Sequence, residues 1–350
     1  MNSSTDPLGH TLLAQRLASI PGHLEAMLRN PPRRAGLPAP RRIAATGIGS
    51  SEAHARYLVW LLNTFSDLPA DFVPLASFVH WPGPEARDCT LVIFSQGLSQ
   101  NTRLVLERRS HFAHTVLFTA STETGLRAAG KGDRADLFVQ LRDSGVEFVP
   151  FRMEDEYTIL IRAVGPACGF LAARQWAQTL PGSRLPQLHP LDVLAAYARA
   201  EAAAPVEAFA TRQAEFSVGF LLLVPPSLVG NGHNLICKFV EGLYWPAPQV
   251  TDLLSFAHGP FQQLAARPRP VVILHADTPP EVDLAQRART MCATLKLDPI
   301  TVALAGSRTL VPLEAEALFN PVILRLAQQL GVDQLNWPGK GLDGPLYAYP

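Results

Sequence analysis

The chain has 350 residues, with 30 basic and 30 acidic side chains and a formal net charge of zero. Hydrophobic residues make up 47% of the sequence and charged residues 17%, which argues against disorder over most of the length. The balanced charge gives no indication of a basic surface for nucleic acid or of an acidic tail, so no nucleic-acid partner is expected. A chain of this length exceeds one ordinary domain core and is expected to form two domains of about 150–175 residues.

The four cysteines, Cys89, Cys168, Cys237 and Cys292, are far apart and form no C-x-x-C pair. The sequence therefore gives no support for a metal site, for thioredoxin-type chemistry or for a bound cofactor. Scattered cysteines are typical of a reducing cytosol. The N-terminus lacks the features of a signal peptide, and no apolar run reaches the roughly 18–20 residues that span a bilayer. These observations predict a cytoplasmic protein without membrane association.

The first half of the sequence alternates between apolar strands and helices. An amphipathic helix, interrupted at Pro21, is expected over residues 9–30, and a proline-rich linker follows it, so that residues 1–40 form helix and linker. The run "RIAATGIGSSEAHARYLVWLLNTF" is expected to form a short apolar strand, a Gly/Ser turn and a helix. Further strands are expected in "ADFVPLASF", "CTLVIFSQ", "TVLFTAS" and "VEFVPF". Strands that alternate with helices favour parallel β-α-β units. A helical pattern over 157–180 completes a first domain, 41–185.

The second half repeats this pattern after the boundary segment "LPGSRLPQLHP". An alanine-rich helix over 190–211 leads into "GFLLLVPPSLVGNGHN", which is expected to form a strand, a Gly/Asn turn and the start of a helix. Further strands are expected at "RPVVILHAD" and "ITVALAG", and helices over 279–296 and 314–330. The predicted second domain is 186–350, including a C-terminal tail. The fold class predicted is therefore α/β, with two tandem domains of one kind, each a parallel sheet flanked by helices.

Two turns in the first half are candidate anion-binding sites. In open α/β sheets, ligands bind at the carboxyl ends of strands, where helix N-termini favour anions. The candidate residues in "TGIGSSEA" and "FSQGLSQNT" are Gly47, Gly49, Ser50, Ser51, Ser95, Gln96, Ser99 and Thr102. The alternative is that serine and glycine only cap helices there. A dinucleotide-binding turn is a weaker alternative, because Glu52 stands where the third glycine of G-x-G-x-x-G belongs.

The stretch "KFVEGLYWPAPQVTDLLSFAHGP" contains candidates for acid/base chemistry. Lys238 and Glu241 are spaced i, i+3 and so share a helix face, and His258 directly precedes Gly-Pro. A carboxylate beside a lysine stays ionised and can move a proton between adjacent carbons. The alternatives are an ordinary surface ion pair and a loop histidine, and the spacing leaves these possibilities open.

The motifs in their order resemble those of the sugar isomerase (SIS) family over nearly the whole chain. "GIGSSEAHA" is similar to the family's G-x-G-S-S-x-x-A loop, and "SQGLSQNT" resembles S-Q-S-G-x-S-P-D with one residue missing. "CKFVEGLYW" resembles L-K-L-K-E-x-x-Y, "AHGPF" the family's H-G-P, and "VDQLNWPGK" its C-terminal segment. The likeness is closest to the isomerase half of glucosamine-6-phosphate synthase and to stand-alone aminosugar-phosphate deaminases and deglycases.

The resemblance implies an enzyme that isomerises or deaminates a sugar phosphate or aminosugar phosphate. Glu241 would be the base for C1–C2 proton transfer, supported by Lys238. His258 would open the sugar ring and would come from the neighbouring subunit, which implies a homodimer with a shared active site. Lys340 would meet the sugar's carbonyl, in some members as a Schiff base. The phosphate would be held by Ser95, Gln96 and Ser99.

Departures from the family pattern keep other functions open. Gly97-Leu98 replaces Ser-Gly-x and removes one phosphate-binding hydroxyl, and Ser255 stands where many relatives carry glutamate. One alternative is a sugar-phosphate-binding protein of the same fold that serves as a sensor with little or no catalysis. A further alternative is isomerisation of an unphosphorylated sugar.

Overall fold

The structure is a computed structural model that describes residues 6–32, 39–80, 84–154 and 158–347. Most of the predicted proline-rich linker, residues 33–38, and the last three residues of the predicted tail lie outside the described residues. The chain forms two compact units, each made of several segments of the sequence. Unit 1 comprises Met1–Pro21, Tyr157–Ala163 and Leu188–Trp337, and unit 2 comprises Gly22–Glu156, Val164–Gln187 and Pro338–Pro350. The tandem-domain boundaries at 41–185 and 186–350 stay predictions.

Unit 2 contains a five-stranded sheet in the order β2-β1-β3-β4-β5, in which every neighbouring pair is parallel. The strands are β1 (Arg42–Thr46), β2 (Ala70–Phe72), β3 (Cys89–Phe94), β4 (His114–Thr119) and β5 (Glu147–Pro150). The three central strands are almost wholly buried, as expected of a parallel sheet with both faces covered.

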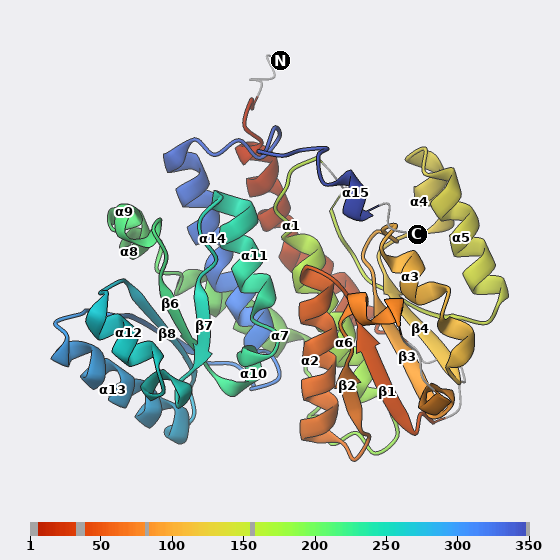
Figure 1. The fold of residues 1–350 in the computed structure, drawn as a ribbon, viewed down its shortest axis with the longest axis horizontal. Helices are drawn as coiled ribbons and strands as arrows, with labels where there is room; N and C mark the ends of the chain where they lie inside the picture. The colour runs from red at the N-terminus through yellow and green to blue at the C-terminus, as the bar shows by residue number, and fades with distance from the viewer. Residues whose placement is uncertain (1–5, 33–38, 81–83, 155–157, 348–350) are drawn as a thin grey trace. The chain divides into compact units, whose positions relative to one another are not determined.

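Helices cover both faces of this sheet (Figure 1). They are α2 (Ser50–Phe65), α3 (Thr102–Leu106), α4 (Glu123–Ala128), α5 (Gly132–Asp143) and α6 (Val164–Gln178). Leu91, Ile93 and Leu117 of the sheet pack with residues of α3, α4 and α5. On the other face, aromatic contacts join Phe94 and Phe118 to residues of α2 and α6. A short helix, α15 (Gly344–Tyr347), belongs to the same unit.

Unit 1 contains a four-stranded parallel sheet in the order β7-β6-β8-β9. Its strands are β6 (Leu221–Val224), β7 (Gln249–Asp252), β8 (Val271–Ala276) and β9 (Ile300–Leu304). Alternate residues of β6 and β8 face opposite sides, because side chains alternate along a strand. Leu221 and Ile273 pack on one side with helices that follow β7 and β8. Phe220, just before β6, contacts aromatic rings on the other side.

The helices of unit 1 are likewise divided between the two faces. They are α7 (Pro190–Ala202), α8 (Val206–Thr211), α9 (Gln213–Phe216), α10 (Pro226–Val229), α11 (His233–Leu243), α12 (Pro260–Ala266), α13 (Pro279–Thr294) and α14 (Val311–Leu330). Rings of Phe209, Phe239 and Phe319 join α8, α11 and α14 in one cluster. Helix α11 runs beside α14, as Figure 1 shows.

The predicted α/β class with parallel sheets flanked by helices is confirmed. Some element bounds differ from the prediction. Helix α1 (His10–Arg29) continues through Pro21, and the strand expected over "ADFVPLASF" ends at Phe72 because a 3₁₀ helix, Leu75–Val79, follows Pro74. The helix expected over 190–211 is broken near Pro205, whose ring fixes φ and removes an N–H donor. Within the described residues, no helix is long and apolar enough to cross a bilayer.

Candidate functional site

The predicted anion-binding turns lie at the topological switch point of the unit 2 sheet. Strands β1 and β3 are neighbours, with Thr46 paired to Ile93. Helix α2, after β1, packs on one face, whereas α3, after β3, packs on the other. The chain therefore diverges at the carboxyl ends of these two strands, the position at which open α/β sheets of this strand order bind ligands. Every predicted phosphate-binding residue lies in one of these two turns.

Two glycines allow the first turn to adopt its conformation. Gly47 lies against the backbone of α2, and Gly49 has a positive φ. A Cβ atom at Gly47 would lie 2.4 Å from the carbonyl oxygen of Ser51, so only glycine fits there. Gly49, the N-cap of α2, has φ +60° and ψ −133°, a conformation open essentially to glycine alone. No side chain caps the α2 N-terminus at this residue. Ser50 and Ser51 form the first turn of the helix, so its amino end is suited to an anion.

The second turn brings three hydroxyl groups together. The Ser95 hydroxyl lies 2.7 Å from the Thr102 hydroxyl, and the Ser99 hydroxyl lies 3.2 Å from it. Ser95 and Thr102 are each 4% exposed, whereas Ser99 is half-buried. The Thr102 hydroxyl therefore contacts the hydroxyls of both Ser95 and Ser99.

Gly97 and Leu98, which stand where the resemblance predicts Ser-Gly-x, form part of this turn. The Gly97 carbonyl accepts a hydrogen bond from Arg134 Nη1 at 2.9 Å. Leu98 has φ +50°, which is strained for a branched side chain, but that side chain is 1% exposed and packs in the hydrophobic core. Burial of the Leu98 side chain in the core therefore stabilises this turn.

The amino ends of α2 and α6 lie side by side. His54, in the second turn of α2, is fully buried, and its Nε2 lies 2.9 Å from the Pro166 carbonyl in the first turn of α6. A Cβ atom at Gly169 would lie 2.2 Å from the His54 ring, which shows how closely the helices approach. Burial lowers the pKa of His54 to about 4, although its bond to Pro166 acts in the opposite direction. This contact is therefore neutral, with Nε2 donating to the carbonyl oxygen.

The amino end of α6 is already occupied by a carboxylate. The Gly165 N–H donates to Glu154 Oε2 at 2.8 Å, and Glu154 is 6% exposed. A carboxylate at this position satisfies the helix end and repels a second anion. The amino end of α2 has no side-chain cap at Gly49, and the Glu52 carboxylate in its first turn is paired with Arg56 at 2.8 Å.

Glu241 lies in the last turn of α11, in unit 1. Its side chain is half-buried, and its carboxylate forms no hydrogen bond or ion pair with any other residue that the structure describes. Burial raises the pKa of Glu241 to about 7, while the positive charges of Arg162 and Lys238 act in the opposite direction. Both protonation states are therefore populated near neutral pH, as a proton-transfer group requires.

Lys238 is bound to α14 rather than paired with Glu241. Its ammonium lies 2.8 Å from Glu316 Oε2 and donates to Asn320 Oδ1 at 2.7 Å. The Lys238 and Glu316 side chains are 2% and 0% exposed. Asn234 donates to the second oxygen of Glu316, and Asn320 Nδ2 lies 3.4 Å from the Tyr197 hydroxyl. The alternative of a surface ion pair between Lys238 and Glu241 is therefore wrong. Lys238 belongs to a buried network with Glu316 and Asn320.

Gln334, which the sequence reading missed, fixes the end of α11. Its side-chain NH₂ group donates to the carbonyls of Glu241 and Gly242, at 3.1 and 3.0 Å. Its Oε1 accepts from the Ile161 N–H at 3.1 Å. The side chain is 0% exposed. Helix ends leave carbonyls without intrahelical partners, and no sequence signal pointed to this role, because Gln334 lies 92 residues from Gly242 along the chain.

The remaining two predicted catalytic residues are exposed. His258 follows the 3₁₀ helix Ser255–Ala257 and directly precedes Gly259, the N-cap of α12. Lys340 lies between Gly339 and Gly341, both of which have positive φ. Lys340 belongs to unit 2, whereas Glu241 and His258 belong to unit 1. Their catalytic roles stay predictions.

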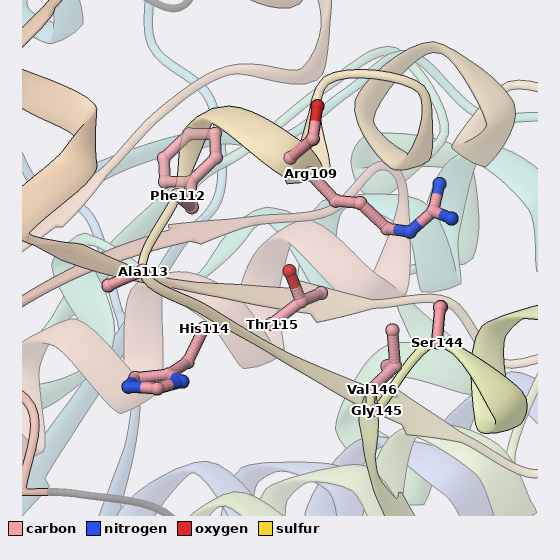
Figure 2. A pocket seen from close by; sticks show the side chains of 9 residues that line it. Arg109, Phe112, Ala113, His114, Thr115, Ser144, Gly145 and Val146 are labelled. Carbon is pink, nitrogen blue, oxygen red and sulfur yellow. The ribbon is translucent and has the colours of Figure 1, made fainter.

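A cleft of about 490 Å³ lies at the opposite, amino edge of the unit 2 sheet. Figure 2 shows Arg109, Thr115 and Ser144 among its lining residues. His114 and Thr115 begin β4, and Val146 precedes β5. None of the predicted site residues lines this cleft. Since α/β sheets bind ligands at the carboxyl edge, we place the candidate site at the turns after β1 and β3. Among the described residues, no group of three or more His, Cys, Asp or Glu side chains could hold a metal ion.

Solved structures with this fold include several enzymes of sugar-phosphate metabolism. The C-terminal domain of glucosamine-fructose-6-phosphate aminotransferase from Francisella tularensis matches with a TM-score of 0.72 and 10% identity, over 92% of this chain and 97% of that one. Glucosamine-6-phosphate deaminase from Thermotoga maritima matches with a TM-score of 0.65 and 14% identity, over 93% and 97%. Tagatose-6-phosphate ketose/aldose isomerase from Escherichia coli matches with a TM-score of 0.59 and 15% identity, over 92% and 89%.

The chain has the fold of SIS phosphosugar isomerases. The resemblance predicted from the order of the motifs is thereby confirmed at the level of the fold. No protein-family model and no curated protein matches the sequence. The identities of 10–15% establish no particular reaction or substrate for this SIS-like chain.

Proposed function

We propose that this chain is an enzyme that isomerises or deaminates a sugar phosphate or aminosugar phosphate. Proton transfer between C1 and C2 follows opening of the sugar ring. The observation that carries the proposal is Glu241, whose carboxyl has a pKa raised to about 7 by burial and no hydrogen-bonding partner among the described residues. A base with a pKa near the working pH can both accept and return a proton. The names of the structurally similar proteins support the substrate class.

The other predicted residues take defined roles in this proposal. The hydroxyls of Ser95, Ser99 and Thr102 and the amino end of α2 bind the phosphate group. His258, supplied by the neighbouring subunit of a homodimer, assists ring opening. Lys340 polarises the substrate carbonyl or forms a Schiff base with it. In the same proposal, the two units are tandem SIS-type domains of a cytoplasmic enzyme.

A second candidate function is a sugar-phosphate-binding protein with little or no catalysis. The observation that favours it is the engagement of Lys238 by Glu316 and Asn320, which leaves this ammonium committed to a buried network. The absent hydroxyl at Gly97 favours a third candidate, an isomerase of an unphosphorylated sugar. In the second function Glu241 is a binding or structural group, whereas in the first and third it transfers a proton.

A ligand screen followed by turnover measurements separates these functions. Ligand binding raises the apparent melting temperature by mass action, so thermal shifts with sugar phosphates and with the corresponding free sugars identify the substrate class. Turnover of a binding sugar phosphate that falls about 10²–10⁴-fold in Glu241→Gln supports the proposal. Glu207→Gln, on an exposed part of α8, is the matched control and should retain activity.

Two outcomes would replace the proposal with its alternatives. Tight binding of sugar phosphates without turnover by the unmodified protein supports the sensor function. Binding and turnover of free sugars alone supports the third candidate. Full activity of Glu241→Gln on a verified substrate would remove the proton-transfer role from α11.

A further inference from the structure

Gln96 is fixed by its backbone but not by its side chain. Its carbonyl oxygen accepts hydrogen bonds from the Ala120 N–H at 2.9 Å and the Thr119 hydroxyl at 3.1 Å. These bonds anchor the residue to the end of β4. Its half-buried side-chain amide forms no hydrogen bond with another residue in the described part of the chain. The amide is therefore available to a ligand, provided that packing holds it in place.

The packing that holds this amide comes from Gly165, in the first turn of α6. A Cβ atom at Gly165 would lie 2.3 Å from Gln96 Oε1 and 2.9 Å from its Cδ. Real Cβ contacts are not this short. The Gln96 amide thus occupies the space that any side chain at residue 165 would fill.

Nothing in the helix itself requires glycine at this position. Gly165 is not among the residues with positive φ, and its N–H bond to Glu154 would persist with any residue except proline. Inside a helix, alanine is favoured over glycine because glycine loses more backbone entropy on folding. The advantage of glycine at residue 165 is therefore that it leaves room for the Gln96 side chain.

We propose that Gly165 is a positioning residue for anion binding, because its missing side chain seats the Gln96 amide beside the Ser95–Thr102 turn. The inference rests on the proposed function, in which this turn binds the phosphate of the substrate. Gly165 acts through Gln96 and does not itself touch the ligand.

The test compares Gly165→Ala with a control glycine in the same unit. Gly132, the first residue of α5, has open space around its Cα and serves as the matched control through Gly132→Ala. Isothermal titration calorimetry with inorganic phosphate should show at least tenfold weaker binding to Gly165→Ala and unchanged binding to Gly132→Ala. The melting temperature of Gly165→Ala should not fall, because the end of a glutamine side chain can move aside and alanine favours the helix.

A double-variant cycle separates positioning from a general structural effect. Gln96→Ala should weaken phosphate binding, and Gly165→Ala should add nothing once Gln96 is alanine. Amide ¹H–¹⁵N spectra supply a readout that needs no ligand: the Gln96 side-chain NH₂ signals should shift in Gly165→Ala and stay unchanged in Gly132→Ala.

The outcomes distinguish failure of this inference from failure of the proposed function. Equal phosphate affinity of the unmodified protein and Gly165→Ala would overturn the positioning role alone, as would unchanged Gln96 NH₂ signals or additive effects in the double variant. Absence of phosphate binding to the unmodified protein would overturn the anion site of the proposed function, and this inference with it.

Discussion

The two parallel sheets have the same strand order around their switch points but carry different chemistry there. In unit 2 the order is β2-β1-β3-β4-β5, and in unit 1 it is β7-β6-β8-β9, the same order without a fifth strand. Helix α2 follows β1 with glycines and hydroxyls at its amino end. Helix α11, the long helix that follows β6, carries Lys238 in its middle and Glu241 in its last turn. The shared topology determines where a ligand can bind, and the side chains of each helix determine whether that position suits anion binding or proton transfer.

The two helices also differ in how they are anchored. The contact of α2 with α6 is neutral and is made by the buried imidazole of His54 and the Pro166 carbonyl. The contact of α11 with α14 is ionic and is made by Lys238 and Glu316. Removing one partner from a buried ion pair leaves an uncompensated charge in a low-dielectric interior. Removing one partner from a neutral contact leaves no such charge. Unit 1 should therefore be the more sensitive of the two to single substitutions at its helix anchor.

The largest expected effect tests this difference directly. Lys238→Met leaves Glu316 buried without a counter-charge and should destabilise unit 1 by about 3–5 kcal/mol, measured by urea unfolding. The double variant Lys238→Met/Glu316→Met replaces the pair with apolar side chains of similar volume and should recover most of this loss. A double variant as unstable as the single one would show that packing, rather than unpaired charge, dominates this anchor.

Two buried carboxyl groups should make the stability of unit 1 depend on pH, whereas the lowered pKa of His54 gives unit 2 a dependence of opposite sign. The pKa of Glu241 rises from 4.5 to about 7 on folding, and burial raises the pKa of Glu314 to about 7 as well. Between these pH values the two carboxyls hold more protons in the folded state than in the unfolded state, so their contribution to the free energy of unfolding falls as the pH rises from 4.5 to 7. Above pH 7 this contribution is constant.

Glu241→Gln isolates the contribution of Glu241 because Glu314 is unchanged in the variant. The variant should be more stable than the unmodified protein at pH 8 by about 1–3 kcal/mol, and equally stable at pH 4. Urea unfolding at both pH values is the measurement. Gln avoids the cost of burying a charge, so the gain should appear only where the carboxyl ionises. An equal gain at both pH values would assign it to packing instead.

The turn after β1 should respond to a change of backbone freedom alone. Gly49→Ala forces a side chain into φ +60° and ψ −133° and should cost about 1–3 kcal/mol in unit 2. Gly22→Ala is the control, because Gly22 lies in α1 with open space around it and needs no special conformation. Thermal unfolding of the two variants measures the difference. If both variants melt together with the unmodified protein, the turn is less constrained than its dihedral angles indicate.

The sequence was sufficient to predict the α/β class and the parallel sheets, because strand and helix patterns are local and repeat along the chain. It also predicted that Ser95, Ser99 and Thr102 lie in one turn, since they are close in sequence. Element ends were less accurate where a proline changed the outcome: Pro205 broke a helix, whereas Pro21 did not. The same residue type has opposite consequences according to its packing, which the sequence pattern does not contain.

The supporting contacts could not be predicted, because they join residues far apart in the chain. Lys238 and Glu316 are separated by 78 residues (316 − 238), and Gln334 binds the carbonyl of Gly242 across 92 residues. Periodicity placed Lys238 and Glu241 on one helix face but gave no information on which neighbouring helix would supply a counter-charge. The close approach of the Gln96 side chain to Gly165 likewise depends on how α6 packs against the end of β3.

The smallest expected effect concerns a single hydroxyl in the unit 2 turn. Ser95→Ala removes the partner of Thr102 at 2.7 Å and one proposed phosphate donor. The loss of one such hydrogen bond costs about 0.5–1.5 kcal/mol, so affinity for inorganic phosphate should fall roughly 2- to 12-fold. Ser144→Ala, at the amino edge of the same sheet, is the control and should bind phosphate like the unmodified protein. If Ser144→Ala weakens phosphate binding and Ser95→Ala does not, the anion binds at the amino-edge cleft of Figure 2, and the switch point of unit 2 loses its proposed role.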